Sequence, residues 1–234
     1  NAIFVKNKAD LNKLISARKN DKSIIGGMLG IEGAHALEGD IENLNRVYEA
    51  GVRMIGLTHF FDNELGGSAH GQSQAGLTEF GKSVVQRMNE LGIFVDLAHC
   101  SPAIVDDVLE MTTMPVMVSH TGVRAVLDSQ RNLSDLQIQK IAENGGIIGI
   151  AFFDEAVGVP ELPNIIASIK HVRDLVGIEY VALGSDYDGS VAVPFDITGF
   201  PLLVEGMMNA GFSEAEIKAI MGENVKRFFL TNLR

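Results

Sequence analysis

The chain is poor in three features that would narrow its class: cysteine, positive charge and long apolar runs. It has one cysteine, Cys100, so no disulfide can form within the chain and the redox compartment stays open. Its 19 lysines and arginines against 30 aspartates and glutamates give a formal net charge of −11, which argues against a nucleic-acid partner because phosphates attract basic side chains. No apolar run approaches a membrane span, and no charged-then-apolar leader begins the chain. We therefore expect a soluble chain of undetermined compartment.

Apolar residues make up 46% of the 234 residues, which is enough for a sizeable core. Runs of apolar and β-branched residues alternate with segments of helical period, a pattern typical of βα units. No break in composition and no internal repeat divides the chain. We therefore predict one domain over residues 1–234.

The predicted elements alternate along the chain. Strands are predicted at residues 23–33, 52–59, 93–99, 115–120, 146–153 and 180–186. Helices are predicted at residues 9–19, 37–50, 134–144 and 163–176, with others beginning at Thr78, at Ser101 and at a capping box on Ser213. A polar, glycine-rich loop spans residues 60–76. Such units form either an open doubly wound sheet or a closed (β/α)8 barrel, and six strands are two short of a barrel.

Polar, ligand-capable side chains end five of the six predicted strands. They are Glu32, His59, His99, His120 and Asp186. In parallel α/β folds the carboxyl ends of the strands share one edge, and sites are built there. One strand-end histidine could simply satisfy a loop backbone, but a series of such residues favours a common site.

Three of these side chains are of the types that bind zinc. Glu32 offers carboxylate oxygens, and His99 and His120 offer imidazole nitrogens. The two oxygens of Glu32 could bridge two ions. A metal held here would make a bound water nucleophilic near neutral pH.

The other predicted site residues suit catalysis and substrate binding. Asp186, in the segment GSDYDGS, is a candidate to orient or deprotonate the metal-bound water. His59 could polarise a carbonyl, and the Arg131 guanidinium could clamp a carboxylate.

Several further features are interpreted as structural. His35 is expected to have a structural role, His70 to be solvent-exposed in its loop, and His171 to lie on the surface of a helix. Cys100 is expected to be a small buried side chain. The segment DYDG lacks the later ligands of a calcium loop, whose twelfth position is Ile197 here.

Long segments of the chain resemble the renal (membrane) dipeptidase family of zinc metallopeptidases. They are IEGAHAL, GVRMIGLTH, GLTEFGKSVVQRMNELGIFVDLAHCS, PVMVSH, RNLSD, GSDYDG and GENVKR, in order from about Ile24 to the end. The resemblance implies a (β/α)8 TIM-type barrel with two zinc ions at its C-terminal face. It also implies hydrolysis of dipeptides, including those with a C-terminal D-residue, and a homodimer by analogy.

The resemblance assigns roles to single positions. It implies that Glu32 bridges the two zinc ions and that His99 and His120 bind the second one. His59 then contacts the substrate and the tetrahedral intermediate, and Asp186 moves the proton between water and leaving amine. Arg131, by the same resemblance, holds the carboxylate of the substrate.

One motif of the family is absent from this sequence. The family begins with a strand that ends in H-x-D and supplies the other two ligands of the first zinc, and no H-x-D occurs in these 234 residues. The first two strands of the expected barrel are missing as well, so we expect a metallo-dependent hydrolase barrel that is incomplete at its N-terminus.

Three hypotheses stay open at this point. The chain could be part of a zinc dipeptidase, a non-catalytic barrel relative used for binding, or a related metal-dependent amidohydrolase or lactonase. Metal content separates the first from the second. Arg131 favours a substrate with a free carboxylate over the third.

Overall fold

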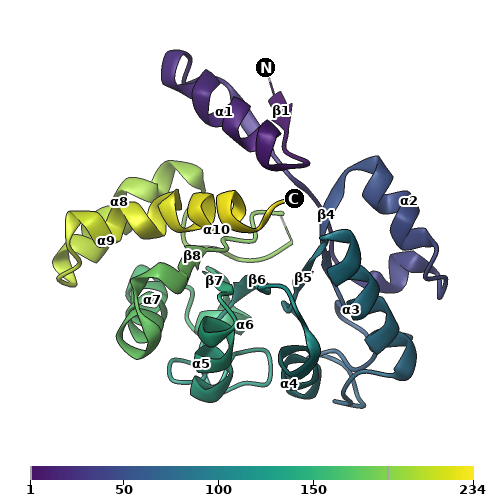
Figure 1. The fold of residues 1–234 in the computed structure, drawn as a ribbon. Helices are drawn as coiled ribbons and strands as arrows, with labels where there is room; N and C mark the ends of the chain where they lie inside the picture. Colours follow the sequence, from purple (N-terminus) through teal and green to yellow (C-terminus); the bar gives the residue numbers. More distant parts are fainter. Residues whose placement is uncertain (1, 189) are drawn as a thin grey trace. The chain divides into compact units, whose positions relative to one another are not determined.

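The computed structural model describes residues 2–188 and 190–234, which divide into two compact units. One unit comprises the chain up to Pro115 together with Lys226–Arg234, and the other comprises Val116–Val225. Both units are built from short strands that alternate with helices (Figure 1). Among the described residues, no helix combines the length and the apolar character needed to span a bilayer.

The first unit holds five strands and most of the N-terminal helices. Its elements are β1 (Ala2–Phe4), α1 (Lys8–Asn20), β2 (Ile25–Gly27), β3 (Leu29–Ile31), a 3-10 turn (Ala34–Leu37), α2 (Asn43–Ala50), β4 (Val52–Gly56), α3 (Glu79–Leu91), β5 (Phe94–Asp96) and α4 (Pro102–Met111). Most of α10 (Asn224–Asn232) also belongs here. β1 and β2 form a small parallel sheet of their own beside α1 (Figure 1).

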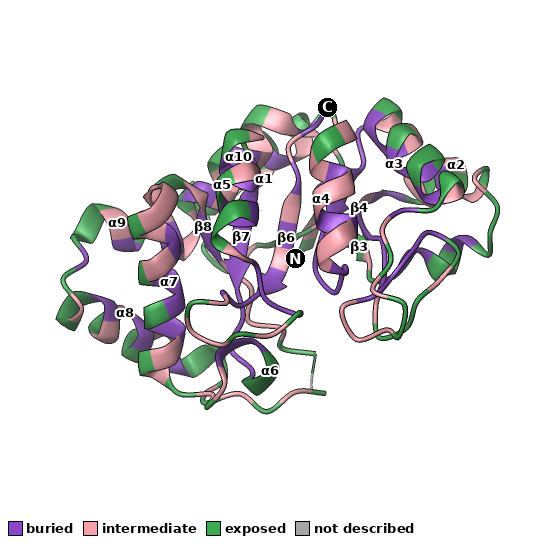
Figure 2. Ribbon diagram, turned by 90° about the horizontal axis from the view of Figure 1, so that it is seen from below, coloured by how far each residue is buried: buried purple, intermediate pink, exposed green. Residues whose placement is uncertain are grey.

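Helix α3 shows how the local sequence sets an element. The Thr78 hydroxyl accepts a hydrogen bond from the Gly81 backbone at 3.0 Å and so caps the helix at its start. Gly92 ends it in the left-handed region at φ 79°, where a side chain would cost energy. Between these caps the inner face buries Val84 and Met88, while the outer face is solvated (Figure 2). Each such apolar side chain stabilises the fold by roughly 1.5–3 kcal/mol.

The second unit contains the remaining strands and helices. Its elements are β6 (Met117–Thr121), α5 (Asp135–Glu143), β7 (Ile147–Ile150), α6 (Asp154–Val157), α7 (Leu162–Val176), a 3-10 turn (Ile178–Tyr180), β8 (Val181–Leu183), a 3-10 turn (Ile197–Gly199), α8 (Phe200–Asn209), α9 (Glu214–Lys218) and a π-helical segment (Ala219–Glu223) that leads into α10. Every residue of β7 is buried, as expected for a parallel strand covered on both faces. Ile141 of α5 and Ile169 of α7 belong to the same core.

The strand order of the main sheet is β3-β4-β5-β6-β7-β8. The pairs β3-β4, β4-β5, β6-β7 and β7-β8 are all parallel. This confirms the predicted α/β class with six successive strands. Among the described residues the six strands do not close into a barrel, and the single domain over residues 1–234 stays a prediction.

The sequence prediction was wrong about the start of the chain. The first element is β1 rather than a helix, and the predicted strand at residues 23–33 is two strands, β2 and β3. β2 pairs with β1 and β3 pairs with β4, so one apolar stretch serves two sheets. Three residues of β1 are too few to show a period.

Other boundaries also differ from the prediction. The helix predicted at residues 37–50 is helical only from Asn43, and α6 and α8 were not predicted. The strands predicted to end at residues 59, 99, 153 and 186 end earlier, at Gly56, Asp96, Ile150 and Leu183, whereas β6 continues past His120 to Thr121. The helix starts predicted at Thr78, Ser101 and Ser213 are confirmed as N-caps, and Ser134 caps α5 as well.

Candidate metal centre and active site

The predicted site residues lie at or just beyond the carboxyl ends of the strands of the main sheet. Glu32 directly follows β3, and His120 lies within β6 near its end. His59, His99 and Asp186 follow shortly after β4, β5 and β8. Parallel strands present their carboxyl ends at one edge of a sheet, and sites in α/β proteins are commonly built at that edge.

Glu32, His59 and His99 form a cluster of acceptor and donor atoms. Glu32 Oε1 lies 3.2 Å from His99 Nε2, and Glu32 Oε2 lies 3.8 Å from His59 Nε2. The two imidazole rings meet edge to face with centroids 4.6 Å apart. His99 is 6% exposed, whereas the side chains of His59 and Glu32 are 32% and 43% exposed, so the cluster is anchored on a buried ring and open on its carboxylate side.

The three predicted metal ligands form one group that could hold a metal ion. Glu32, His99 and His120 each offer one ligand atom, and these atoms lie within 4.8 Å of one another. One carboxylate oxygen and two imidazole nitrogens are a donor set that suits zinc. The residues present therefore form a candidate metal site, and their donor types suit zinc.

The backbone at two site residues adopts an uncommon conformation. His99 has φ 61° and Asp186 has φ 60°, both in the left-handed region that residues other than glycine rarely occupy. Such strain persists only where surrounding structure holds it, and it concentrates at functional sites. Gly33, beside Glu32, has φ 96°, and a Cβ there would lie 3.2 Å from His59 Cβ and 2.6 Å from the His35 ring. Only glycine lets this backbone pass so close.

His99 has a second histidine against its other ring nitrogen. His70 Nε2 lies 3.0 Å from His99 Nδ1. The ring of Phe60 lies beside both imidazoles, with centroids 5.0 Å from His70 and 5.7 Å from His99. The expectation of a solvent-exposed His70 was wrong, because the loop folds back onto the end of β5 and half-buries the ring.

Backbone hydrogen bonds tie the glycine-rich loop to the cluster. The Ala69 N–H donates to the His99 carbonyl at 2.8 Å, and the Ser68 hydroxyl donates to the His59 carbonyl. The Asp62 carboxylate accepts the backbone N–H groups of Ser68 at 2.8 Å and Ser73 at 3.0 Å. The bonds from Ser73 and Ser68 hold the pKa of the Asp62 carboxyl below its usual value, so it stays ionised in the loop at neutral pH.

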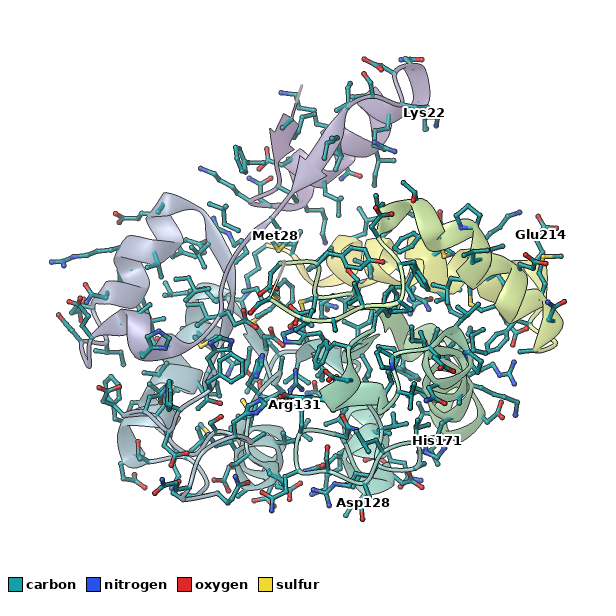
Figure 3. The ribbon with its side chains drawn as sticks, turned by 180° about the vertical axis from the view of Figure 1, so that it is seen from behind. Lys22, Met28, Asp128, Arg131, His171 and Glu214 are labelled. Atoms are coloured by element: carbon teal, nitrogen blue, oxygen red, sulfur yellow. The ribbon has the colours of Figure 1, made fainter. Side chains whose placement is uncertain are left out.

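The second unit supplies His120 and Arg131. His120 Nδ1 lies 2.8 Å from the Ser119 hydroxyl, and Arg131 Nη2 donates to the His120 carbonyl at 2.9 Å. Arg131 is 8% exposed, and its guanidinium carbon lies 5.8 Å from the centre of the Phe153 ring. Figure 3 shows Arg131 inside this unit, whereas His171 lies toward its outside.

A pocket of about 350 Å³ lies beside Asp186 in the second unit. Its lining residues are Asp186, Tyr187, Val191, Val193, Asp196 and Ile197. Partial burial and the nearby Asp196 charge raise the pKa of the Tyr187 hydroxyl, so it is protonated at neutral pH. The pocket therefore places an apolar wall next to the predicted proton carrier.

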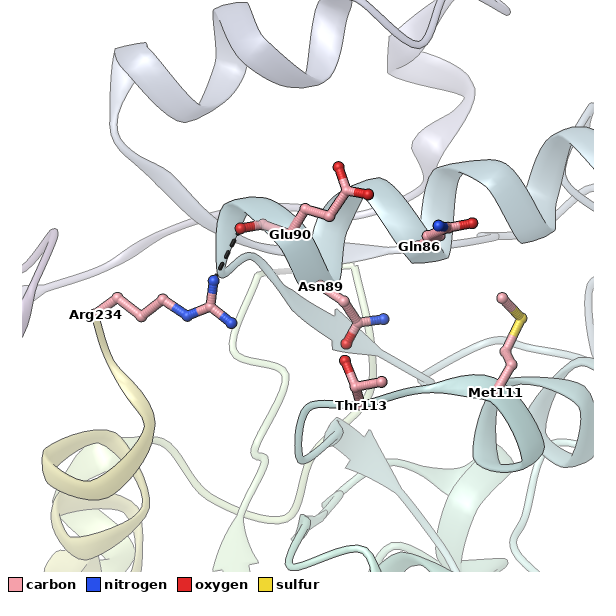
Figure 4. A pocket seen from close by; sticks show the side chains of 6 residues that line it. All are labelled: Gln86, Asn89, Glu90, Met111, Thr113 and Arg234. Atoms are coloured by element: carbon pink, nitrogen blue, oxygen red, sulfur yellow. Dashed lines mark hydrogen bonds between the residues drawn. The ribbon is translucent and has the colours of Figure 1, made fainter.

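A larger pocket, of about 490 Å³, lies away from these residues in the first unit (Figure 4). It is lined by Gln86, Asn89, Glu90, Met111, Thr113 and Arg234, and Arg234 donates to the Glu90 carbonyl at 2.8 Å. Gln86, Asn89 and Glu90 lie in the C-terminal half of α3, Met111 and Thr113 lie at and just after the end of α4, and Arg234 follows α10. The pocket holds none of the predicted site residues.

Cys100 has the structural role expected of it. The thiol is buried beside the end of β5, and burial raises its pKa to about 12. A thiol that stays protonated at neutral pH is a poor nucleophile, because the thiolate is the reactive form. His171 likewise lies away from the cluster, with its Nε2 2.7 Å from an oxygen of Asp135.

Sequence reasoning missed two supporting residues, His70 and Ser119. His70 was expected to be exposed to solvent in its glycine-rich loop, and Ser119 was not considered. One signal in the sequence could have pointed to His70. It lies in the polar loop at residues 60–76, which follows the strand that ends at His59 and precedes the strand that ends at His99.

The parallel sheet with a carboxylate and histidines at its carboxyl edge defines the chain as an α/β protein with a candidate metal centre. Residues 4–232 match the model of the family described as Membrane dipeptidase (Peptidase family M19). The chain belongs to this family.

Relatives of known name agree with this assignment. Dipeptidase 3 of Mus musculus is 32% identical over 225 residues, covering 90% of this chain and 45% of that protein. The chain thus spans about half the length of the curated relatives it matches. A metallo peptidase of Rhodobacter sphaeroides, solved with a phosphinate mimic of the dipeptide L-Ala-D-Ala, superposes with a TM-score of 0.85 at 26% identity, covering 100% of this chain and 69% of that one. An amidohydrolase of Pseudomonas aeruginosa superposes with a TM-score of 0.86 at 25% identity, covering 99% of this chain and 78% of that one.

Proposed function

We propose that the protein hydrolyses dipeptides with the aid of zinc bound by Glu32, His99 and His120. Membership of the membrane dipeptidase family supports the activity, and the Rhodobacter sphaeroides relative holds a dipeptide mimic. The observation that carries the proposal is the convergence of one carboxylate and two imidazole ligand atoms within 4.8 Å.

The orientation of each histidine supports a role as ligand. His99 turns Nε2 toward Glu32 while Nδ1 faces His70, and His120 has Nδ1 beside the Ser119 hydroxyl. A metal-binding histidine is commonly fixed through its second nitrogen in this way. When bound, zinc supplies a water nucleophile near neutral pH and polarises the scissile carbonyl.

His59 and Asp186 are proposed to stabilise the developing negative charge and to transfer the proton. His59, beside Glu32 and partly exposed, is placed to donate a hydrogen bond to the carbonyl oxygen as negative charge develops on it. Asp186 accepts a proton from the attacking water and returns it to the leaving amine. A carboxylate suits both steps because it alternates between acceptor and donor.

Substrate selection is proposed to rest on Arg131 and on the pocket beside Asp186. The Arg131 guanidinium pairs with the free carboxylate of the dipeptide, a geometry that arginine can satisfy with two parallel bonds. The pocket lined by Val191, Val193 and Ile197 takes an apolar side chain. A C-terminal D-residue is proposed to be accepted, as the bound L-Ala-D-Ala mimic of the relative suggests.

The number of zinc ions is a separate proposal. We propose two per complete site, bridged by Glu32, although the H-x-D pair that the first zinc needs is absent from this sequence. A homodimer is also proposed by analogy, and light scattering measures it directly.

The experiment that tests the proposal is a substrate panel run with and without zinc. We expect L-Ala-D-Ala and L-Ala-L-Ala to be hydrolysed, a chelator to stop turnover, and zinc to restore it. N-acetyl-alanine amide and a simple lactone should be hydrolysed slowly or not at all. Zinc uptake without hydrolysis of any dipeptide would favour the binding relative, and preferred lactone hydrolysis would favour the related amidohydrolase or lactonase.

A further inference from the structure

We propose that His70 is a positioning residue that fixes His99 for metal binding, by accepting the Nδ1–H proton of His99 on its own Nε2. The two nitrogens lie 3.0 Å apart, within hydrogen-bond distance. This inference rests on the proposed zinc site, because it assigns His70 to one ligand of that site.

The tautomer of His99 explains why a partner is needed. A neutral imidazole carries one proton, and a nitrogen that binds a metal must be free of it. His99 turns Nε2 toward Glu32 at 3.2 Å, so a shared cation would take Nε2 and leave the proton on Nδ1. The Nδ1–H group then requires an acceptor, and His70 Nε2 is in place to accept it.

Burial increases the importance of this acceptor. His99 is 6% exposed, and the Phe60 ring lies beside its imidazole, so water has little access to the His99 ring. A buried N–H left without an acceptor costs about 1–3 kcal/mol. A neutral acceptor here thus stabilises the ring orientation that presents Nε2 to the cation.

The loop holds His70 in place independently of its side chain. The His70 N–H donates to the Ser68 hydroxyl at 3.1 Å, and the Gln74 side-chain amide donates to the carbonyls of Ser68, Ala69 and Gly71 at 3.1, 3.2 and 2.9 Å. The Ala69 N–H is bound to the His99 carbonyl at 2.8 Å. His70 therefore reaches its partner from a backbone that is already fixed.

A bland alternative is that His70 merely fills space in the loop. A space-filling role requires the volume of the ring but no acceptor atom at its end. The two roles are separable by substitution, because glutamine keeps an acceptor and leucine keeps only volume.

The test measures zinc affinity by competition with a chromophoric chelator for the wild type, His70→Gln, His70→Leu and the control His171→Ala. We expect His70→Leu to weaken zinc binding by about 10–100-fold, the range seen when the hydrogen-bond partner of a ligand is removed. His70→Gln should recover most of the affinity, and His171→Ala should match the wild type. Melting temperatures of the metal-free proteins check that each variant folds.

A second readout follows the proton itself. Nitrogen-15 spectra of the zinc-loaded wild type should show His99 protonated on Nδ1 and His70 unprotonated on Nε2. Equal zinc affinities for the wild type and His70→Leu, a wild type that binds no zinc, or a His70 ring protonated on Nε2 in the loaded protein would each overturn the positioning role. If zinc affinity falls in His70→Leu as expected but the wild type cleaves no dipeptide, the proposed function is wrong and the positioning role of His70 stands.

Discussion

The ends of β5 and β6 each present one histidine of the candidate metal centre, but they hold it in different ways. His99 lies beyond its strand with φ 61°, and its Nδ1 partner comes from a distant loop. His120 lies inside its strand, and its Nδ1 partner is the preceding residue, Ser119. The orientation of the His99 ring therefore depends on a contact with a distant loop, whereas that of the His120 ring depends on its neighbour in the same strand.

This difference predicts different sensitivities. The support of His99 is the ring of His70, which hydrogen bonds of the loop hold in place. The support of His120 is a rotatable hydroxyl on a half-buried residue, which water can replace. The half of the site near β5 should therefore be the more easily damaged by changes outside the ligands themselves.

The largest effect is expected from removal of either ligand. His99→Ala and His120→Ala should each lose zinc and dipeptidase activity together, because one side chain supplies a large part of a three-residue donor set. Metal content measured by atomic emission alongside turnover checks this. A variant with full activity and no bound metal would end the metal-centre account for both strands alike.

Asp186→Asn should come next. The amide cannot accept the proton, so we expect turnover to fall by about 10²–10⁴-fold while zinc content stays that of the wild type. Rate and metal measurements on the same sample separate this outcome from loss of the site. Equal loss of zinc would place Asp186 among the ligands rather than with the proton.

Arg131→Lys should have a smaller and more selective effect. Lysine keeps the charge but not the planar fork, so we expect KM for free dipeptides to rise by about 10-fold or more with kcat less affected. Peptides with an amidated C-terminus should show little change, since they lack the carboxylate. A uniform fall in kcat on both substrates would contradict a role in substrate binding.

Ser119→Ala should have the smallest effect and completes the comparison. We expect zinc affinity to fall by less than about 10-fold, below the loss for His70→Leu, because water can replace the hydroxyl at His120 Nδ1. Zinc competition on both variants measures the difference. An order reversed between them would show that the end of β6, and not the loop near β5, is the sensitive half.

The sequence predicted the main sheet well because its signals are local. Caps such as Thr78 and Ser213 and runs of buried residues such as those of β7 are determined within a few positions. It failed at β1, whose three residues are recognisable only through their pairing with β2. A short strand has too little pattern to be found without its partner.

The candidate site shows the same limit. Strand-end polarity led to Glu32, His99 and His120, because parallel strands bring their ends to one edge. The role of His70 could not be predicted, since its contact with His99 depends on how a loop without periodicity folds back. The backbone conformation of His99 and of Asp186 has no signal in the sequence either.

The most direct test of the metal centre is the position of zinc in crystals of the protein, found by anomalous diffraction at the zinc edge. The account predicts a peak about 2.0–2.2 Å from a Glu32 oxygen and about 2.0–2.1 Å from Nε2 of His99 and of His120. A zinc-saturated protein whose peak lies away from these three side chains would contradict it.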